Sequence, residues 1–222
     1  MPIGFRILPS APQIDAAVIA RFASLPTGNV ADSMGRFRST SDRIRALVPG
    51  KVLCGTAVTV LTRAGDNLMV HKALELARPG DVVVVDTTGG YRAAVIGELM
   101  THSALAAGLA GFVVDGAVRD LAELRRLGLP VFAAAVTATS CDKDGPGEIN
   151  VPIACGGVVV CPGDLVLGDD DGVVVVPSAL VDEVLVAAER KNASESDRIK
   201  EIQAGQLFLP EIDAELRRKG VV

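Results

Sequence analysis

The feature that most constrains the fold is a run of four valines at positions 82–85, which follows the turn-forming sequence Pro79-Gly80-Asp81. Valine favours strands, and a strand that is apolar on both faces must be covered on both sides. The run ends in the segment 86–90, Asp-Thr-Thr-Gly-Gly, where glycine lets a backbone approach a ligand closely. We therefore expect a central, buried strand of an α/β protein, with polar groups at its carboxyl end.

Hydrophobic periodicity alternates between strand and helix patterns along the rest of the chain. Strands are expected over 51–62 (with a bulge at Gly55), 82–86, 111–115 and 131–136, and near 156–160, 164–168 and 172–176. Helices are expected over 13–24, 29–35, 66–77 (capped by Asp66), 92–109, 118–127, 179–204 and 211–219, and a polar loop over 139–150. No linker divides the pattern, so we predict one α/β domain over 1–222.

Composition excludes several classes of function. The chain has 22 Lys and Arg against 27 Asp and Glu, a net charge of -5, and only 3% aromatic residues. This balance argues against nucleic-acid binding and base stacking. The longest stretch without charge, 99–114, is shorter than the roughly 18 apolar residues of a membrane span. Four cysteines without C-x-x-C spacing and an N-terminus without an apolar run predict a cytoplasmic protein with reduced thiols.

The first candidate site residues are Gly97, Glu98, Leu99 and Met100, inside the segment expected to be helical. If a helix starts at Gly97, the amides of Leu99 and Met100 are free donors that suit a carboxylate. The alternative is that Gly97 only permits close packing on the sheet and that Glu98 is merely solvated.

Arg119 and Asp120 form the second candidate group, because they follow another buried strand. A helix cap and a surface ion pair are the ordinary roles of such residues. Two strand ends in one sheet, however, place Glu98 in the same crevice. A hard oxygen ligand, a guanidinium and a second acid suit a divalent metal ion that handles a 2-oxo acid.

With these residues the chain resembles the RraA-like family, which includes class II aldolases acting on 4-hydroxy-4-methyl-2-oxoglutarate and 4-carboxy-4-hydroxy-2-oxoadipate. The resemblance rests on Glu98, twenty intervening residues and Arg119-Asp120, and on the flanking segments 27–35 and 162–177. It implies a layered α/β/β/α sandwich, homotrimers or homohexamers, and active sites between subunits. C-terminal helices at about 179–219 would contact a neighbouring subunit.

The activity that the resemblance implies is retro-aldol cleavage to pyruvate with Mg²⁺ or Mn²⁺, accompanied by oxaloacetate decarboxylation. Asp120 would bind the metal, and Arg119 would hold the 2-oxo acid and stabilise the enolate. The amides of Leu99 and Met100, next to Gly97, would hold the carboxylate of the substrate. Glu98, where the family's aldolases typically have Asp, would carry a proton through a water molecule.

Two alternatives to a metal-dependent aldolase remain open. A Schiff-base aldolase is disfavoured because only six of the 22 basic residues are Lys and none lies in a valine-rich strand. Other RraA-like proteins are regulators that bind ribonuclease E without catalysis. Those regulators lack the acid after the Arg, so Asp120 favours the enzyme.

The remaining polar residues are interpreted conservatively. His102, one helical turn after Glu98, is assigned to support or packing, and His71 to structure. The acidic triplet 169–171 is read as a turn, and the arginines within 36–45 as a solvated loop or as contacts to an acidic substrate from a neighbouring subunit. Glu189 and Glu195 are unranked candidates for an acid that reaches the site of a neighbouring subunit.

Overall fold

The valine strand forms as expected and lies in the middle of the main sheet of the computed structural model, which describes residues 3–222. This strand, β4 (Asp81–Asp86), pairs in parallel with β3 (Leu53–Thr62) on one side and with β6 (Gly111–Val118) on the other. All four valines are buried. The prediction of a central strand covered on both faces is confirmed.

The main sheet continues outward from these three strands, with the strand order β1-β8-β3-β4-β6-β7-β2. β3 also pairs with β11, which is followed by β12 in a hairpin, and β5 pairs with the end of β6. The additional strands are β1 (Phe5–Ile7), β2 (Arg45–Ala46), β5 (Ala94–Ile96), β7 (Val131–Val136), β8 (Gly147–Ile149), β11 (Leu165–Asp169) and β12 (Gly172–Val176), and a separate pair consists of β9 (Ile153–Cys155) and β10 (Val158–Val160).

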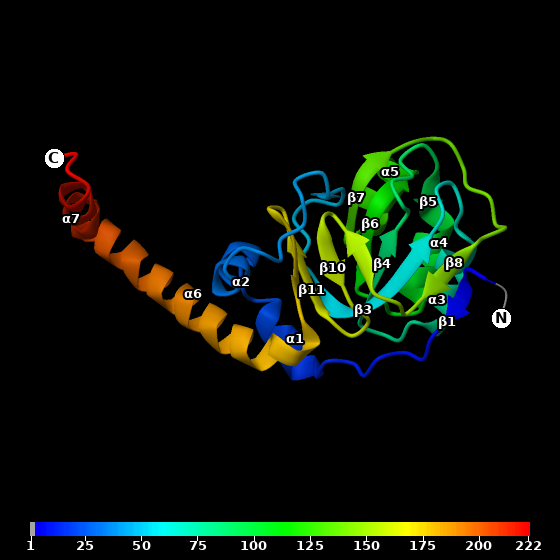
Figure 1. Cartoon of the computed structure of the whole chain (residues 1–222), viewed down its shortest axis with the longest axis horizontal. Coiled ribbons are helices and arrows are strands. Elements are labelled where there is room, and N and C mark those ends of the chain that lie inside the picture. The colour runs from blue at the N-terminus through cyan, green and yellow to red at the C-terminus, as the bar shows by residue number, and fades with distance from the viewer. Residues whose placement is uncertain (1–2) are drawn as a thin grey trace.

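The helices are α1 (Ala16–Phe22), α2 (Thr27–Ser33), α3 (Leu68–Leu76), α4 (Glu98–Ala106), α5 (Leu121–Leu127), α6 (Val181–Gln203) and α7 (Pro210–Arg218). Those up to the first half of α6 lie against the outer faces of the strands, and the rest of α6 and α7 extend away from them (Figure 1). The predicted helices over 13–24, 29–35, 66–77, 179–204 and 211–219 are confirmed within a few residues at their ends. Asp66 accepts a hydrogen bond from the Leu68 amide at 2.9 Å, as expected of a cap at the start of α3.

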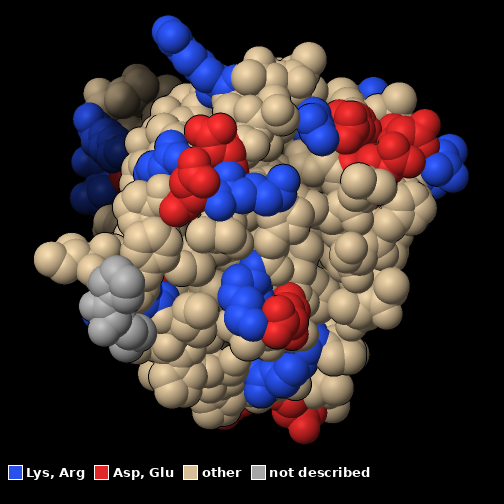
Figure 2. Space-filling view, turned by 90° about the vertical axis from the view of Figure 1, so that its right-hand side faces the viewer, with Lys and Arg blue, Asp and Glu red and all other residues tan. Residues whose placement is uncertain are grey.

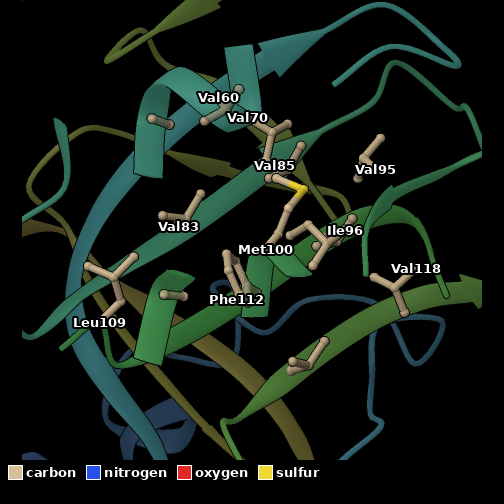
Figure 3. Close-up of a cluster of buried hydrophobic side chains, with 14 of the residues drawn as sticks. Val60, Val70, Val83, Val85, Val95, Ile96, Met100, Leu109, Phe112 and Val118 are labelled. Carbon is tan, nitrogen blue, oxygen red and sulfur yellow. The ribbon is translucent and has the colours of Figure 1, made fainter. Parts of the chain in front are cut away.

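Three buried clusters show that the chain is layered. The first lies between α3, α4, α5 and the main sheet, and Figure 3 shows Met100 of α4 within it, close to Val85 and Ile96. The second lies between the opposite face of β4, β6 and β7 and the strands β9 to β12. The third lies between β11, β12 and the helices α1, α2 and α6. The order helix, sheet, sheet, helix confirms the predicted α/β/β/α sandwich.

β3 connects the two sheet layers because its two edges pair with different strands. Residues 56–61 pair in parallel with β4, whereas residues 53–56 pair antiparallel with β11. Gly55 was expected to form a bulge, but it is paired in regular register with Val166. A glycine is needed here because the backbone of Gly80 lies so close that a Cβ at Gly55 would overlap its carbonyl oxygen.

Two helices begin later in the chain than the sequence predicts. The helix expected over 92–109 begins only at Glu98, because Ala94–Ile96 forms strand β5 against β6. These three residues are buried, and a short apolar run fits a strand and a helix equally well by periodicity. The helix expected over 118–127 begins at Leu121, because β6 extends to Val118.

Short strands account for the other differences from the sequence-based prediction. The predicted loop over 139–150 contains β8, and β1, β2 and β9 had no counterpart in the prediction. Each has two or three residues, too few for an alternating pattern to stand out.

The C-terminal helices form an arm that leaves the body of the molecule (Figure 1). The first half of α6 packs through residues such as Val184 and Leu185 against the layer formed by β11 and β12. The arm proper, residues 193–222, carries exposed apolar side chains: Ile199, Ile202, Leu207, Phe208, Leu209 and Ile212. Among residues 3–222, no helix is both long and apolar enough to cross a membrane.

Candidate functional site

The site is built where two adjacent strands end. β5 and β6 run side by side, with Ile96 paired to Val118, and the Arg119 amide donates to the Ile96 carbonyl at 3.0 Å. Directly beyond this pair, the Glu98 amide donates to Oδ2 of Asp120 at 3.0 Å. Nε of Arg119 lies 3.5 Å from the same oxygen. The structure therefore brings Glu98, Arg119 and Asp120 together as predicted, but the strand that leads to Glu98 is β5 and not the valine strand β4.

Gly97 makes this contact sterically feasible. A Cβ at Gly97 would lie 2.6 Å from Oδ2 of Asp120 and 3.0 Å from Cγ of Arg119. The backbone of Gly97 is extended, with φ -148° and ψ -166°, a conformation open to any residue. The glycine is thus required by space, because a side chain would push the carboxylate and the guanidinium away from α4.

Asp120 has an unusual backbone that turns its side chain toward α4. Its φ of 59° and ψ of 40° are left-handed, and it occupies the N-cap position of α5 without capping that helix through its side chain. Aspartate tolerates this conformation better than most residues, but it is still uncommon outside glycine. The Asp120 carboxylate, which would ordinarily cap α5, instead accepts a hydrogen bond from the Glu98 amide at the start of α4.

The start of α4 presents two backbone donors, as predicted for a helix beginning at Gly97. The first bond within the helix runs from the Thr101 amide to the Gly97 carbonyl at 3.1 Å. The amides of Leu99 and Met100 precede it and have no acceptor within the helix. The Met100 side chain is buried in the core shown in Figure 3, whereas the Leu99 side chain is 78% exposed. Packing of Met100 thereby fixes the orientation of both donors.

These groups line a cavity of about 130 Å³, together with Ile96 and Ala94. Gly97, Glu98, Leu99, Met100 and Arg119 all contribute to its wall. Asp120 does not line it and meets the site at its rim, through the Glu98 amide. Glu98 also lies near His102, with Oε1 3.7 Å from Nε2, which agrees with a supporting role for that histidine.

The opposite wall consists of residues that the sequence analysis did not select. Asn67, Ser140, Cys141 and Lys143 line the cavity, and so does His71, which was interpreted as structural. They come from the start of α3 and from the segment before β8, far from residues 97–120 in the chain. The parallel bridge between Ala94 and Ser140 brings that segment to β5. Nothing in the spacing of the sequence indicates this contact.

Asp66 holds that opposite wall in place. Its side chain is fully buried, and Oδ2 accepts from the amides of Asp144 and Gly145, both at 2.8 Å. Burial alone would raise the pKa of Asp66, but the amide donors of Leu68, Asp144 and Gly145, with the charge of Arg63, lower it below its usual value. The ionised carboxylate thus fixes the segment that carries Lys143.

The cavity favours an anionic ligand. Two of its lining side chains, Arg119 and Lys143, are basic, and the helix start adds partial positive charge. Burial, and next the charge of Lys143, lower the pKa of His71, so this imidazole is neutral at neutral pH. Glu98 is the acid among the lining residues.

Asp120 fits the requirements of a divalent metal ligand. Its side chain is 38% exposed, and its Oδ1 receives no hydrogen bond from the part of the chain that the structure describes. Over residues 3–222, no three His, Cys, Asp or Glu side chains cluster as a metal site. A metal ion here would have one carboxylate from this chain and would keep several waters, which suits Mg²⁺.

The residues that were interpreted conservatively have structural partners. Asp169 accepts from the amide and the hydroxyl of Thr27, and Asp170 accepts from the Gly50 amide, so the predicted turn of the acidic triplet is confirmed. Glu189 pairs with Arg21 at 2.6 Å, and Glu195 pairs with Lys191 at 3.1 Å.

Two of the arginines within 36–45 have acidic partners in the fold. Arg36 pairs with Asp32, and Arg43 lies 3.7 Å from Asp115 and over the ring of Tyr91. On the face that Figure 2 shows, Lys and Arg side chains lie beside Asp and Glu side chains, with uncharged areas between them.

A layered α/β/β/α protein with a cavity at the ends of its parallel strands, lined in part by basic side chains, is the class that fold and site define. The family model described as RraA-like, "Aldolase/RraA", matches residues 27–175. The chain belongs to the RraA-like family, which confirms the resemblance seen in the sequence.

Similar proteins include ones named as aldolases and one described within an inhibitor family. A Halalkalibacterium halodurans protein, provisionally named 4-hydroxy-4-methyl-2-oxoglutarate aldolase, is 40% identical over 86% of this chain and 90% of its own length. A Thermus thermophilus protein named 4-hydroxy-4-methyl-2-oxoglutarate aldolase is 42% identical over 50% of this chain and 68% of its own. The crystal structure of Streptomyces coelicolor RraAS2, described as an unusual member of the RNase ES inhibitor RraA family, has a TM-score of 0.75 at 30% identity and covers 85% of this chain and 98% of its own.

Asp66→Asn is predicted to destabilise the fold by about 1–3 kcal/mol at pH 7, because an amide NH₂ would face the donors of Asp144 and Gly145. The pKa of Asp66 is lowered by folding, so the stability it contributes is present above the ordinary carboxyl pKa and is lost as pH falls through the folded value. The difference between the variant and the wild type should therefore shrink below about pH 4. Urea unfolding followed by circular dichroism over a pH series measures both effects.

The matched control for this prediction is Asp142→Asn, a neighbouring carboxylate that is 70% exposed and lies 3.6 Å from Arg63. It should change stability by less than about 0.5 kcal/mol. Equal losses in the two variants, at every pH, would contradict the role given to Asp66.

Proposed function

We propose that this chain is a divalent-metal-dependent aldolase. Its substrate would be 4-hydroxy-4-methyl-2-oxoglutarate (HMG) or 4-carboxy-4-hydroxy-2-oxoadipate, its product pyruvate, and its side activity oxaloacetate decarboxylation. The two relatives named as aldolases support lyase activity. The observation that carries the proposal is the junction at Gly97. There Arg119 and the first residues of α4 line one cavity, and the Asp120 carboxylate lies at its rim, bound to the Glu98 amide.

Substrate binding follows from the donors at this junction. The amides of Leu99 and Met100 bind the carboxylate next to the 2-oxo group, where the helix start favours negative charge. Arg119 binds the 2-oxo oxygen and the same carboxylate through its planar guanidinium. Lys143 lies in the opposite wall of the cavity, where it would bind the second anionic group of a dicarboxylate.

Cleavage breaks the C3–C4 bond of the substrate. Its electrons move to C3 and into the enolate of pyruvate, while the C4 hydroxyl loses its proton and becomes a carbonyl group. Glu98 takes that proton through a water molecule and later returns it to C3. A divalent cation bound at Asp120 would supply positive charge to the enolate oxygen, and Arg119 stabilises the same charge.

A second candidate function is binding to a ribonuclease without catalysis. The structural similarity to RraAS2 of Streptomyces coelicolor favours it, since that protein is described within an inhibitor family. Asp120 argues for the enzyme: its left-handed backbone and its contact with α4 present a carboxylate at the cavity rim that binding to another protein would not require.

Asp120→Asn is predicted to reduce pyruvate release from HMG at least about 100-fold, because the neutral amide loses the negative charge that would hold the metal. Pyruvate release coupled to lactate dehydrogenase is the measurement, with Mg²⁺ or Mn²⁺ present and after EDTA treatment. EDTA should abolish wild-type activity, and added metal should restore it.

Asp171→Asn, an exposed aspartate in the β11–β12 turn, is the control and should keep wild-type activity. If metal-loaded wild type releases no pyruvate from HMG or oxaloacetate, yet captures a purified ribonuclease and lowers its activity, the regulator is the correct alternative.

We also propose that the chain assembles as a homotrimer or homohexamer through its C-terminal arm. A nine-residue helix such as α7 is marginal in isolation, and here its apolar residues lie exposed next to Leu207, Phe208 and Leu209. Most charged residues of the arm pair within their own helices, for example Arg218 with Glu215. The exposed apolar residues of the arm are therefore available to pack against another copy of the chain.

Phe208→Ser combined with Ile212→Ser is predicted to shift the assembly toward the 22.9 kDa protomer, because it removes exposed apolar area from the arm. Light scattering coupled to size exclusion measures the mass. Glu211→Gln on the same helix is the control and should leave the mass unchanged. A wild-type mass of one protomer would contradict the proposal.

A further inference from the structure

Asn67 holds an acceptor that the folded chain leaves unused. The residue is 8% exposed and lines the cavity opposite Arg119. Its backbone amide donates to the Asp142 carbonyl, and its Nδ2 donates to the Val95 carbonyl, both at 3.1 Å. No group among residues 3–222 donates to its Oδ1. A buried acceptor without a donor costs about 1–3 kcal/mol, so its retention in a cavity wall points to a ligand.

The orientation of this amide is determined by its surroundings. Rotating it by 180° would place Oδ1 against the Val95 carbonyl oxygen and would remove the bond of Nδ2. The contact of 3.8 Å between Nδ2 and the sulfur of Met100 ties the same group to the start of α4. The unpartnered atom is therefore an oxygen, which accepts a hydrogen bond but cannot bind a carboxylate.

The cavity consequently offers two different kinds of polar group to one ligand. Leu99 and Met100 supply donors for an anion, and Asn67 supplies an acceptor for a hydroxyl group. Pyruvate, the product of the proposed cleavage, has a carboxylate and a carbonyl group but no hydroxyl donor. The aldol substrate differs from it by the C4 hydroxyl.

We propose that Asn67 is a specificity-determining residue that accepts a hydrogen bond from the C4 hydroxyl of a 4-hydroxy-2-oxo acid. This inference rests on the proposed aldolase function and names the feature of the substrate that the site selects. An amide oxygen is too weak a base to take the hydroxyl proton, which leaves through the water beside Glu98. Asn67 thus orients the hydroxyl group before the C3–C4 bond breaks.

The test compares a ligand with the hydroxyl group and a ligand without it in the same variant. Asn67→Ala should lower kcat/KM for HMG about tenfold in the Mg²⁺-loaded enzyme, as expected for the loss of one hydrogen bond to the substrate. Binding of pyruvate to the same preparation, measured by calorimetry, should change less than about twofold. A merely structural role would weaken both by the same factor.

A control variant separates the loss of this acceptor from the loss of a buried asparagine elsewhere. Asn29→Ala removes another buried asparagine, whose Nδ2 donates to Asn192 at 3.3 Å, and should leave the ratio of the two measurements at the wild-type value.

The outcomes are distinct. Parallel losses for HMG and pyruvate in Asn67→Ala would overturn the inference while leaving the aldolase intact. A metal-loaded wild type that releases no pyruvate from HMG would overturn the proposed function, and the inference with it. A selective loss for HMG in Asn67→Ala, absent in Asn29→Ala, is the expected result.

Discussion

The hydrogen bond from the Glu98 amide to the Asp120 carboxylate joins the two strand–helix connections from which the cavity is built. It requires β5 and β6 to end side by side, Asp120 to adopt a left-handed backbone, and Gly97 to lack a side chain. Each of these conditions is local, yet together they determine where Arg119 and the start of α4 meet. The valine strand β4 contributes indirectly, because it pairs with β6 and so positions the strand that leads to Arg119 and Asp120.

The core and the site share residues, which explains how a small cavity keeps its shape. Met100 packs among the valines and phenylalanine of the core and also lines the cavity. Ile96 lies in the same core and ends the strand that leads to Gly97. On the other wall, buried Asp66 fixes the segment before β8 through two backbone amides. The cavity is therefore lined by groups whose positions follow from packing and not from flexible loops.

Much of this arrangement could be predicted from the sequence. The valine run predicted a buried parallel strand, and the meeting of Glu98 with Arg119 and Asp120 was predicted as well, although it depends on β5 and not on the end of the valine strand. The β5 strand could not be predicted, because three apolar residues carry no usable period and become a strand only by pairing with β6. Asn67 and Lys143 were missed for a different reason: tertiary contacts through Asp66 and Ser140 bring them to the cavity, and no spacing along the chain records those contacts.

The central claim is that the space above Gly97 sets the geometry of the site, and kcat/KM of Gly97→Ala for HMG tests it most directly. A methyl group there would meet Asp120 and Arg119, while the extended backbone of Gly97 accepts alanine without strain. Displacing catalytic groups by about 1 Å costs on the order of 100-fold in rate. We predict such a loss with a thermal unfolding midpoint close to that of Gly28→Ala, whose added methyl group meets no atom within 4 Å. Wild-type kcat/KM in Gly97→Ala would contradict the claim.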